Sequence, residues 1–151
     1  MRLGSIAELI NDRDVITATP LVTAREATKL MTRRRVGAVV VVDGGRVVGM
    51  FSERDLMTRV VAAERDPDRT TLGEVMTPAP QTVTPEDRVE TVIAWMLSGR
   101  FRHLPVLDGP HLAGIVSQGD VVAFLQASLG LAEEPEEPAP DSTAAAAPSS
   151  A

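Results

Sequence analysis

The stretch Gly49-Met50-Phe51-Ser52-Glu53-Arg54-Asp55 (GMFSERD) recurs 65 positions later as Gly114-Ile115-Val116-Ser117-Gln118-Gly119-Asp120 (GIVSQGD). Each copy has a glycine, two apolar residues, a serine and, three residues after the serine, an aspartate. A serine followed at this spacing by an acidic residue is typical of a capped helix start. The duplication leaves two interpretations open: a pair of helix caps, or a pair of equivalent turns that line a polar pocket.

The repeat extends far beyond this stretch. A shift of 65 residues places residues 17–57 on residues 82–122 with 11 identities in 41 aligned positions. A shift of 66 residues aligns residues 5–10 with residues 71–76. Self-similarity at a fixed spacing indicates one structural unit used more than once. The sequence therefore predicts two copies of a single unit.

Within each copy the hydrophobic pattern changes in the same order. A short capped helix and an extended segment come first, followed by an amphipathic helix, a buried strand, an Asp-Gly turn, a return strand and a last helix. The elements after the short helix are expected at 15–18, 24–31, 38–42, 47–51 and 52–63, and again at 81–83, 89–96, 104–107, 112–116 and 117–129. The sequence thus predicts an α/β fold with the order β-α-β-β-α twice, in which two small sheets pack about a pseudo-twofold axis and helices flank them.

Composition limits the class of protein. Hydrophobic residues make up 44% of the chain and aromatic residues only 3%, so the predicted core is aliphatic. The absence of cysteine excludes disulfides and thiolate metal sites, and two histidines offer no metal-ligand cluster. No apolar run has the length of a signal peptide or a membrane span. We therefore expect a soluble cytoplasmic protein without membrane contact.

The net charge of −6 is concentrated at one end of the chain. Five acidic residues and no basic residue lie between residues 132 and 151, which leaves −1 for the rest (−6 minus −5). This Pro-, Ala- and Ser-rich segment is predicted to be disordered. A nearly neutral body disfavours nucleic-acid binding. The basic run 33–35 is interpreted as a solvated helix end.

The chain resembles a tandem pair of CBS (cystathionine beta-synthase) domains, the Bateman module. The residues that carry the resemblance are 36–43 with 49–55, 100–108 with 114–120, and Glu74-Val75-Met76-Thr77-Pro78 leading into the second copy. The resemblance implies a first CBS domain at 4–64, a linker at 65–70, a second CBS domain at 71–129 and a tail at 130–151. We expect no attached catalytic, DNA-binding or transporter domain, and the chain is therefore similar to the stand-alone members of the family.

The resemblance also implies an adenylate ligand (AMP, ADP or ATP, with S-adenosylmethionine and NAD(H) as further candidates) in two clefts between the copies. In each cleft the aspartate would accept hydrogen bonds from both ribose hydroxyls, and the serine at a helix start would face a phosphate. The first cleft is expected to contain Gly49, Met50, Ser52, Arg54, Asp55, Thr82, Val83, Phe101, Arg102 and His103. The second is expected to contain Thr17, Ala18, Gly37, Ala38, Gly114, Ile115, Ser117 and Asp120.

The two clefts are not expected to be equal. Arg54, Arg102 and His103 offer charge to phosphates in the Asp55 cleft, whereas the equivalent positions of the other cleft hold Gly119, Gly37 and Ala38. The Asp55 cleft is therefore expected to bind phosphorylated adenylates better. An exposed basic pair at the rim remains the alternative interpretation of Arg102 and His103.

No motif for nucleophilic, metal-assisted or nucleotide-hydrolysing catalysis occurs, so the sequence disfavours an enzyme. The resemblance implies instead a regulatory, energy-sensing module that transmits ligand occupancy to an unidentified partner protein and forms a homodimer through its helices. A ligand-independent dimeric scaffold for protein interactions is the alternative.

Overall fold

Each half of the chain folds into a β-hairpin with a helix before it and a helix after it, which confirms the predicted α/β class. The structure is a computed structural model that describes residues 2–10 and 15–131. The first half contains β1 (Thr17–Ala18), α1 (Ala24–Arg34), β2 (Ala38–Asp43), β3 (Arg46–Ser52), α2 (Glu53–Asp55) and η2 (Leu56–Val61). The second half contains α4 (Val89–Leu97), β5 (His103–Asp108), β6 (His111–Ser117) and α5 (Gln118–Ser128). The remaining elements are the short helices η1 (Ile6–Glu8) and α3 (Leu72–Val75) and the short strand β4 (Thr77–Pro78).

The helices begin where the sequence places their caps. Thr23 Oγ1 accepts a hydrogen bond from the Glu26 amide at 3.2 Å, and the Glu26 carboxylate accepts one from the Thr23 amide at 3.2 Å. Arg35 ends α1 in the left-handed conformation with φ 54°. The last helices of the two halves differ, because α2 continues into the π-helix η2 whereas α5 is α-helical throughout.

The two hairpins match in detail. In the first half β1, β2, β3 and β4 form one sheet in that order, with β1 parallel to β2 and the other pairs antiparallel. In the second half β5 and β6 pair alone, and a single parallel bridge between Val83 and Val106 stands where β1 pairs with β2. Both hairpins shift register at the same repeat position, after Val41 and after Val106. The predicted extended segment 81–83 therefore makes one bridge and no strand.

Each half is completed by the short helix that begins the other copy in the sequence. The Ile6 amide of η1 donates to the Asp87 carbonyl of the second half at 2.8 Å, and the Leu72 amide of α3 donates to the Val22 carbonyl of the first half at 2.8 Å. The side chain of Ile6 is buried in the core of the second half, and that of Leu72 in the core of the first half. The chain thus crosses between the halves twice.

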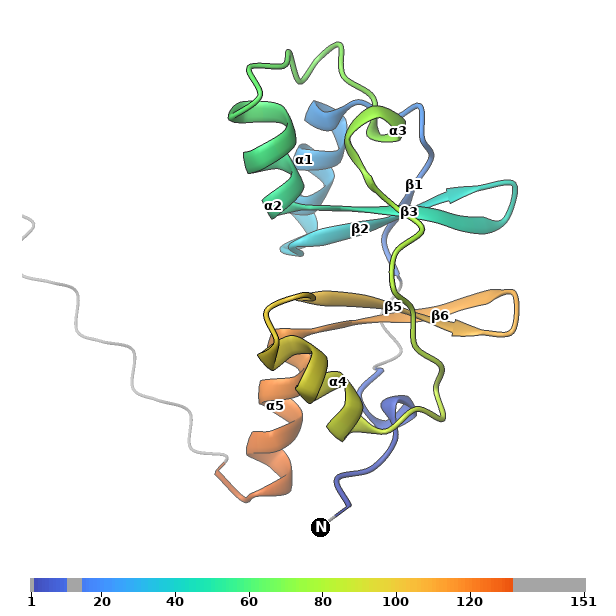
Figure 1. The fold of residues 1–151 in the computed structure, drawn as a ribbon, viewed down its shortest axis with the longest axis vertical. Coiled ribbons are helices and arrows are strands. Elements are labelled where there is room, and N and C mark those ends of the chain that lie inside the picture. Colours follow the sequence, from blue (N-terminus) through green and yellow to red (C-terminus); the bar gives the residue numbers. More distant parts are fainter. Residues whose placement is uncertain (1, 11–14, 132–151) are drawn as a thin grey trace, which may run out of the picture.

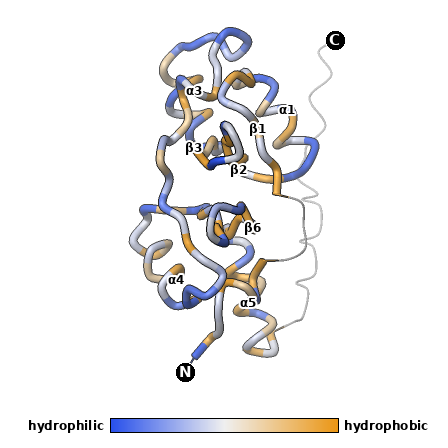
Figure 2. Tube along the Cα trace, turned by 90° about the vertical axis from the view of Figure 1, so that its right-hand side faces the viewer, coloured by the Kyte–Doolittle hydropathy of each residue, from blue (hydrophilic) through white to orange (hydrophobic). Residues whose placement is uncertain are grey.

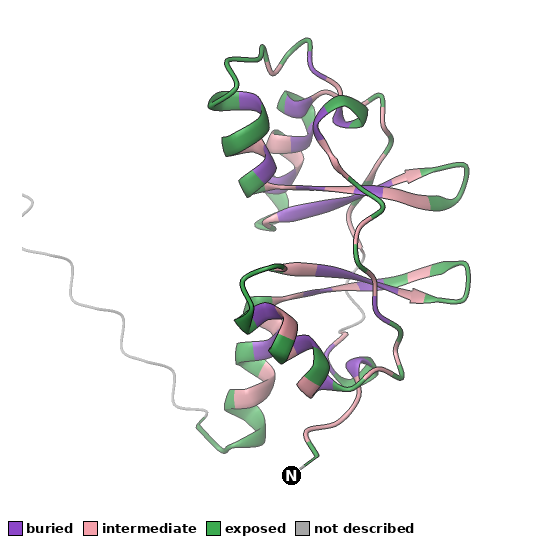
Figure 3. Ribbon diagram, in the orientation of Figure 1, coloured by how far each residue is buried: buried purple, intermediate pink, exposed green. Residues whose placement is uncertain are grey.

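The two hairpins face each other in the middle of the molecule, and the helices cover their outer sides (Figure 1). Parts of β2, β3 and β6, which lie between the helices, consist of apolar residues (Figure 2). Buried residues lie along the strands and on the inner sides of the helices, whereas the hairpin tips are exposed (Figure 3). Within the described chain, no helix combines the length and the apolar character needed to cross a bilayer. This layered arrangement brings both strand-to-helix turns toward the plane between the halves.

Candidate functional site

Two cavities lie between the halves, one at each Ser-x-x-Asp turn. The larger, here called the Asp120 cavity, has a volume of about 220 Å³, and the smaller, the Asp55 cavity, about 160 Å³. The Asp120 cavity is lined by Leu9, Ile10, Val15, Ile16, Arg35, Val36, Gly37, Ala38, His103, Gly114, Ile115, Ser117 and Asp120. The Asp55 cavity is lined by Met50, Ser52, Glu53, Arg54, Asp55, Thr77, Pro80, Gln81, Arg100, Phe101, Arg102 and His103. Both cavities draw residues from both halves.

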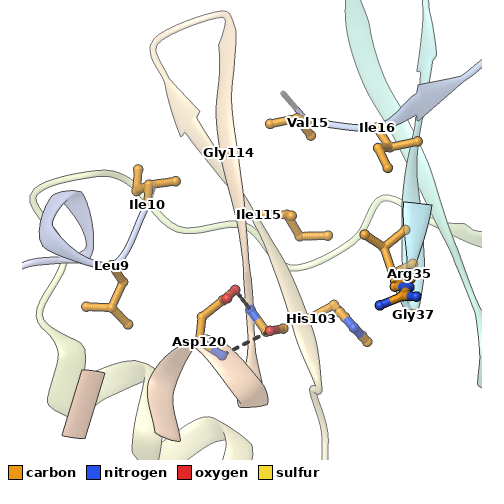
Figure 4. A pocket seen from close by; sticks show the side chains of 13 residues that line it. Leu9, Ile10, Val15, Ile16, Arg35, Gly37, His103, Gly114, Ile115 and Asp120 are labelled. Carbon is orange, nitrogen blue, oxygen red and sulfur yellow. Dashed lines mark hydrogen bonds between the residues drawn. The ribbon is translucent and has the colours of Figure 1, made fainter. Parts of the chain in front are cut away.

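In the Asp120 cavity the aspartate belongs to the helix cap. The Asp120 carboxylate accepts a hydrogen bond from the Ser117 amide at 2.8 Å, and Ser117 Oγ accepts one from the Asp120 amide at 3.1 Å, as the dashed lines in Figure 4 show. Leu9 and Ile10 line one side of the cavity, and Arg35, Gly37 and His103 lie on the opposite side (Figure 4). The Asp120 side chain is half-buried. The cap and the pocket interpretations of the turn therefore both describe the same residues.

In the Asp55 cavity the aspartate is buried and more heavily bonded. Its Oδ2 accepts from the Ser52 amide at 2.9 Å and from Ser52 Oγ at 3.1 Å. Its Oδ1 accepts from Thr77 Oγ1 at 3.1 Å and lies 3.5 Å from Arg59 Nε. Arg59 also donates to the Met76 carbonyl at 2.8 Å. Asp55 thus joins the last helix of the first half to the segment that connects the halves.

Charge is distributed unequally between the cavities. Arg54, Arg100 and Arg102 line the Asp55 cavity, together with the carboxylate of Glu53. Arg35 is the one arginine among the described residues that line the Asp120 cavity, whose other walls are largely aliphatic. Gly37 and Ala38, the uncharged equivalents of Arg102 and His103, do line this cavity, and Arg35 and His103 line it as well. The Asp55 cavity still has the higher positive charge.

His103 lines both cavities. It begins β5, at the repeat position that Ala38 occupies in β2, and its half-buried imidazole packs over Gly37 of the other half. A Cβ atom on Gly37 would lie 3.2 Å from His103 Nε2 and 3.2 Å from Glu53 Oε1. Burial lowers the pKa of His103 from 6.5, and Arg102 lowers it further, whereas Glu53 and Asp120 oppose the shift.

Two predicted residues of the Asp120 cavity lie outside its walls. Thr17 is exposed on β1, and Ala18 packs against the core of the first half. Val15 and Ile16, just upstream in the same extended segment, line the cavity instead. Thr17 and Ala18 belong to β1, which pairs with β2 along the sheet, whereas Val15 and Ile16 precede this strand.

Three predicted residues of the Asp55 cavity also line neither cavity. Gly49 lies under Met76, whose side chain occupies the space that a Cβ atom on Gly49 would take. Val83 is buried in the core of the second half, and Thr82 precedes it. Thr77, Pro80 and Gln81 of the connecting segment line the cavity in their place. All other predicted site residues line the cavity for which they were predicted.

The arginines that sequence reasoning left out are Arg35 and Arg100. They occupy equivalent positions of the repeat and line the Asp120 and the Asp55 cavity respectively. Arg35 enters its cavity because it stands at the left-handed end of α1, where the backbone turns toward β2. Both arginines could have been predicted from the repeat, because the arginine is identical in the two copies and few side chains outside the turns are retained in both.

The arrangement defines a class of protein: an α/β module of two repeats with two polar cavities, one at each repeat, at the plane between facing hairpins. Within residues 2–10 and 15–131 no group of three or more His, Cys, Asp or Glu side chains could hold a metal ion. The chain belongs to the CBS domain family, because the family profile described as "CBS domain" matches residues 6–62 and again residues 72–127.

Similar proteins carry the same domains. The chain is 36% identical to the CBS domain-containing protein YhcV of Bacillus subtilis over 107 residues, which cover 71% of this chain and 76% of that protein. It is 44% identical over 86 residues to the meiotically up-regulated gene 70 protein of Schizosaccharomyces pombe, with 57% of this chain covered. The chain spans only 12% of that relative and 51% of the mitochondrial CBS domain-containing protein CBSX3 of Arabidopsis thaliana.

Solved structures agree with the fold. A putative signal-transduction protein with CBS domains from Burkholderia ambifaria superposes with a TM-score of 0.78 at 32% identity, covering 88% of this chain and 99% of that chain. The structure of CBSX2 in complex with AMP superposes with a TM-score of 0.70 at 23% identity, covering 86% of this chain and 99% of that chain.

Proposed function

We propose that this protein is a regulatory module that binds adenosine nucleotides in the Asp55 and Asp120 cavities and transmits their occupancy to a partner protein. The observation that carries the proposal is the juxtaposition, in each cavity, of an aspartate at a strand-to-helix turn with an arginine at the repeat position of Arg35 and Arg100. The complex of CBSX2 with AMP supports it, because that protein shares the fold.

The chemistry of the cavities suits a nucleotide. An ionised aspartate has several acceptor positions and can receive both hydroxyls of a ribose, and an arginine offers paired donors to a phosphate. The aliphatic walls of the Asp120 cavity, formed by Ile10, Ile16 and Ile115 among others, suit the face of an adenine ring. In the Asp55 cavity Phe101 is the aromatic wall residue. Each cavity thus offers groups for base, sugar and phosphate.

The two cavities select different ligands in this proposal. The three arginines of the Asp55 cavity favour a di- or triphosphate, and the single arginine of the larger Asp120 cavity favours AMP. A ribose at Asp55 must compete with Thr77 and Arg59 for the carboxylate. Binding there would therefore release a contact between η2 and the connecting segment, which gives occupancy a route to the shape of the module.

A homodimer completes the proposal. Exposed apolar side chains lie on the outer helices of both halves, with Met57 60% and Val61 67% exposed on η2 and Val122 56% exposed on α5. A second copy could bury these residues, and a change in the contact between η2 and the connecting segment would alter the surface that the dimer offers to a regulated protein. The domain bounds 4–64 and 71–129 and the tail 130–151 stay predictions, as does the compartment.

The test is a search for ligand on the purified protein. Native mass spectrometry should find AMP, ADP or ATP, and added AMP, ATP, NADH or S-adenosylmethionine should raise the melting temperature where it binds, because a ligand of the native state alone stabilises it. Asp55→Asn and Asp120→Asn, which keep the shape of the side chain, are the matched variants. Absence of stabilisation by all four compounds would reject the proposal in favour of a ligand-independent scaffold.

A further inference from the structure

We infer that His103 couples the two cavities, so that an anionic ligand in one of them weakens the binding of an anionic ligand in the other. The inference rests on the proposed function and adds a relation between its two sites. The coupling depends on the position of a single side chain. Among the residues that the structure describes, His103 alone lines both cavities.

The imidazole reaches both cavities because the first half leaves room for it. The repeat position of His103 in the first half is Ala38, and the residue before it is Gly37, so these two positions carry no side chain larger than a methyl group. Nε2 and Cε1 of His103 lie 3.2 and 3.3 Å from the point where a Cβ atom of Gly37 would stand. The imidazole therefore borders both cavities, and no second histidine stands at the equivalent position.

The groups around His103 come from both cavities and from both halves. Glu53 faces it from the start of α2 in the Asp55 cavity, and Asp120 faces it from α5 in the Asp120 cavity. Arg102 precedes it in the chain. Each carboxylate raises the pKa of His103 against the effect of burial, because the ring lies close to charged groups of both cavities. A ligand phosphate placed beside Arg54 or beside Arg35 adds charge to one of these two sides.

The sign of the coupling follows from the donor count. Burial favours the neutral imidazole, which has one N–H donor and one acceptor nitrogen. A phosphate in one cavity can take the donor, and a phosphate in the other then meets a lone pair across the same ring. Two anions on opposite sides of one ring also repel each other. We therefore expect the second ligand to bind about fivefold or more weakly than it would alone, the lower end of ordinary coupling between sites.

Variants that impair one cavity at a time, here called single-cavity variants, measure binding in the other cavity alone. Arg54 and Arg35 are exposed, and each lines one cavity only, so Arg54→Gln weakens anion binding in the Asp55 cavity and Arg35→Gln weakens it in the Asp120 cavity, with little risk to folding and without a new negative charge near His103. His103→Ala gives the second half the residue that the first half already has at this position, Ala38. Gly37→Ala keeps the imidazole and pushes it from its place.

The experiment is a calorimetric titration with AMP, and with sodium pyrophosphate as an anion without a nucleoside, combined with NMR of the imidazole Cε1–H. The chain has two histidines, and His111 in the exposed hairpin is the internal reference. In both single-cavity variants the His103 resonance should shift and that of His111 should not. In the wild type, the weaker site should bind AMP about fivefold or more weakly than the same site does in the variant whose other cavity is impaired. In His103→Ala and in Gly37→Ala this difference between the wild-type and single-cavity affinities should disappear.

Three results would overturn the coupling: a His103 shift in only one single-cavity variant, wild-type affinities equal to those of the single-cavity variants, or a difference that persists in His103→Ala. Pyrophosphate coupling without AMP binding would instead reject the nucleotide and uphold the role of His103. Absence of binding of both compounds would overturn both proposals.

Discussion

The two cavities are built on the same turn, yet their aspartates differ in surroundings. Asp55 is buried, with 7% of its surface exposed, and is bonded to Ser52, Thr77 and Arg59, whereas Asp120 is half-buried and belongs to a cap with Ser117. The residues that differ come from elements outside the turn, mainly the connecting segment 76–81. A repeated motif thus specifies where two sites stand, and the segments that cross between the halves specify what each site can hold.

The largest expected effect separates the cavities by charge. Arg54→Gln should lower the affinity for ATP about tenfold or more, since it removes a charge-assisted donor, and should leave the tighter AMP affinity nearly unchanged. Arg35→Gln should do the reverse. Calorimetry with both nucleotides measures this. Equal losses of both ligands in both variants would show that the cavities are not selective.

The second effect concerns stability. Asp55→Ala should lower the free energy of unfolding by about 2–3 kcal/mol, because it removes a cap and leaves the part-buried donors of Ser52 and Thr77 without this partner. Asp120→Ala should cost about 1 kcal/mol, the ordinary value of a cap. Urea denaturation of both variants tests the ranking. A larger loss for Asp120→Ala would reverse the comparison of the two aspartates.

The third effect is the pH dependence of folding stability that arises from the imidazole of His103. Burial lowers the pKa of His103 below its value of 6.5 in the unfolded chain, so the unfolded state binds more protons as pH falls below that value. His103 therefore favours folding above pH 6.5 and loses this contribution as pH falls through the folded pKa. Melting temperatures at pH 7.5 and pH 5.5 should differ less in His103→Gln than in the wild type. The prediction fails if the two differences are equal.

The smallest effect concerns the side-chain contacts that hold the two segments that cross between the halves. Glu90 of α4 accepts from the Leu3 amide at 3.0 Å, and at the equivalent position of α1 Arg25 pairs with Asp68 at 2.6 Å. The Leu3 amide is the main reason why the pKa of Glu90 falls from 4.5 to about 2, so this contribution is present above pH 4.5 and is lost between pH 4.5 and pH 2.

We expect Arg25→Ala to change the free energy of unfolding by at most about 1 kcal/mol, because its ion pair is exposed. Glu90→Gln should remove this contribution near neutrality and therefore flatten the loss of stability between pH 4.5 and pH 2. Acid titration of the melting temperature distinguishes the two. A steep loss that survives in Glu90→Gln would assign it to other carboxylates.

Local patterns foretold most of the fold and only part of the site. Caps, helix faces and hairpin turns act over a few residues, so the repeat predicted the helices, the hairpins and the Ser-x-x-Asp turns. The partner of each short helix depends on contacts between distant residues such as Ile6 with Asp87, which no local pattern encodes. For the same reason Thr77 and Val15 were missed, and His103 was assigned to one cavity because its reach depends on the absence of a side chain at Gly37.

The exchange of the short helices also sets an order for folding during synthesis. Ile6 and Leu9 pack into a core whose other members lie between residues 83 and 121, so the first segment made is the last to find its place. The core of the first half, by contrast, is complete once Val75 has left the ribosome. A nascent chain stalled so that Val75 has left the ribosome and Val121 has not should therefore hold a protease-resistant first half and a cleavable N-terminus, with the joint between the halves formed only at the end.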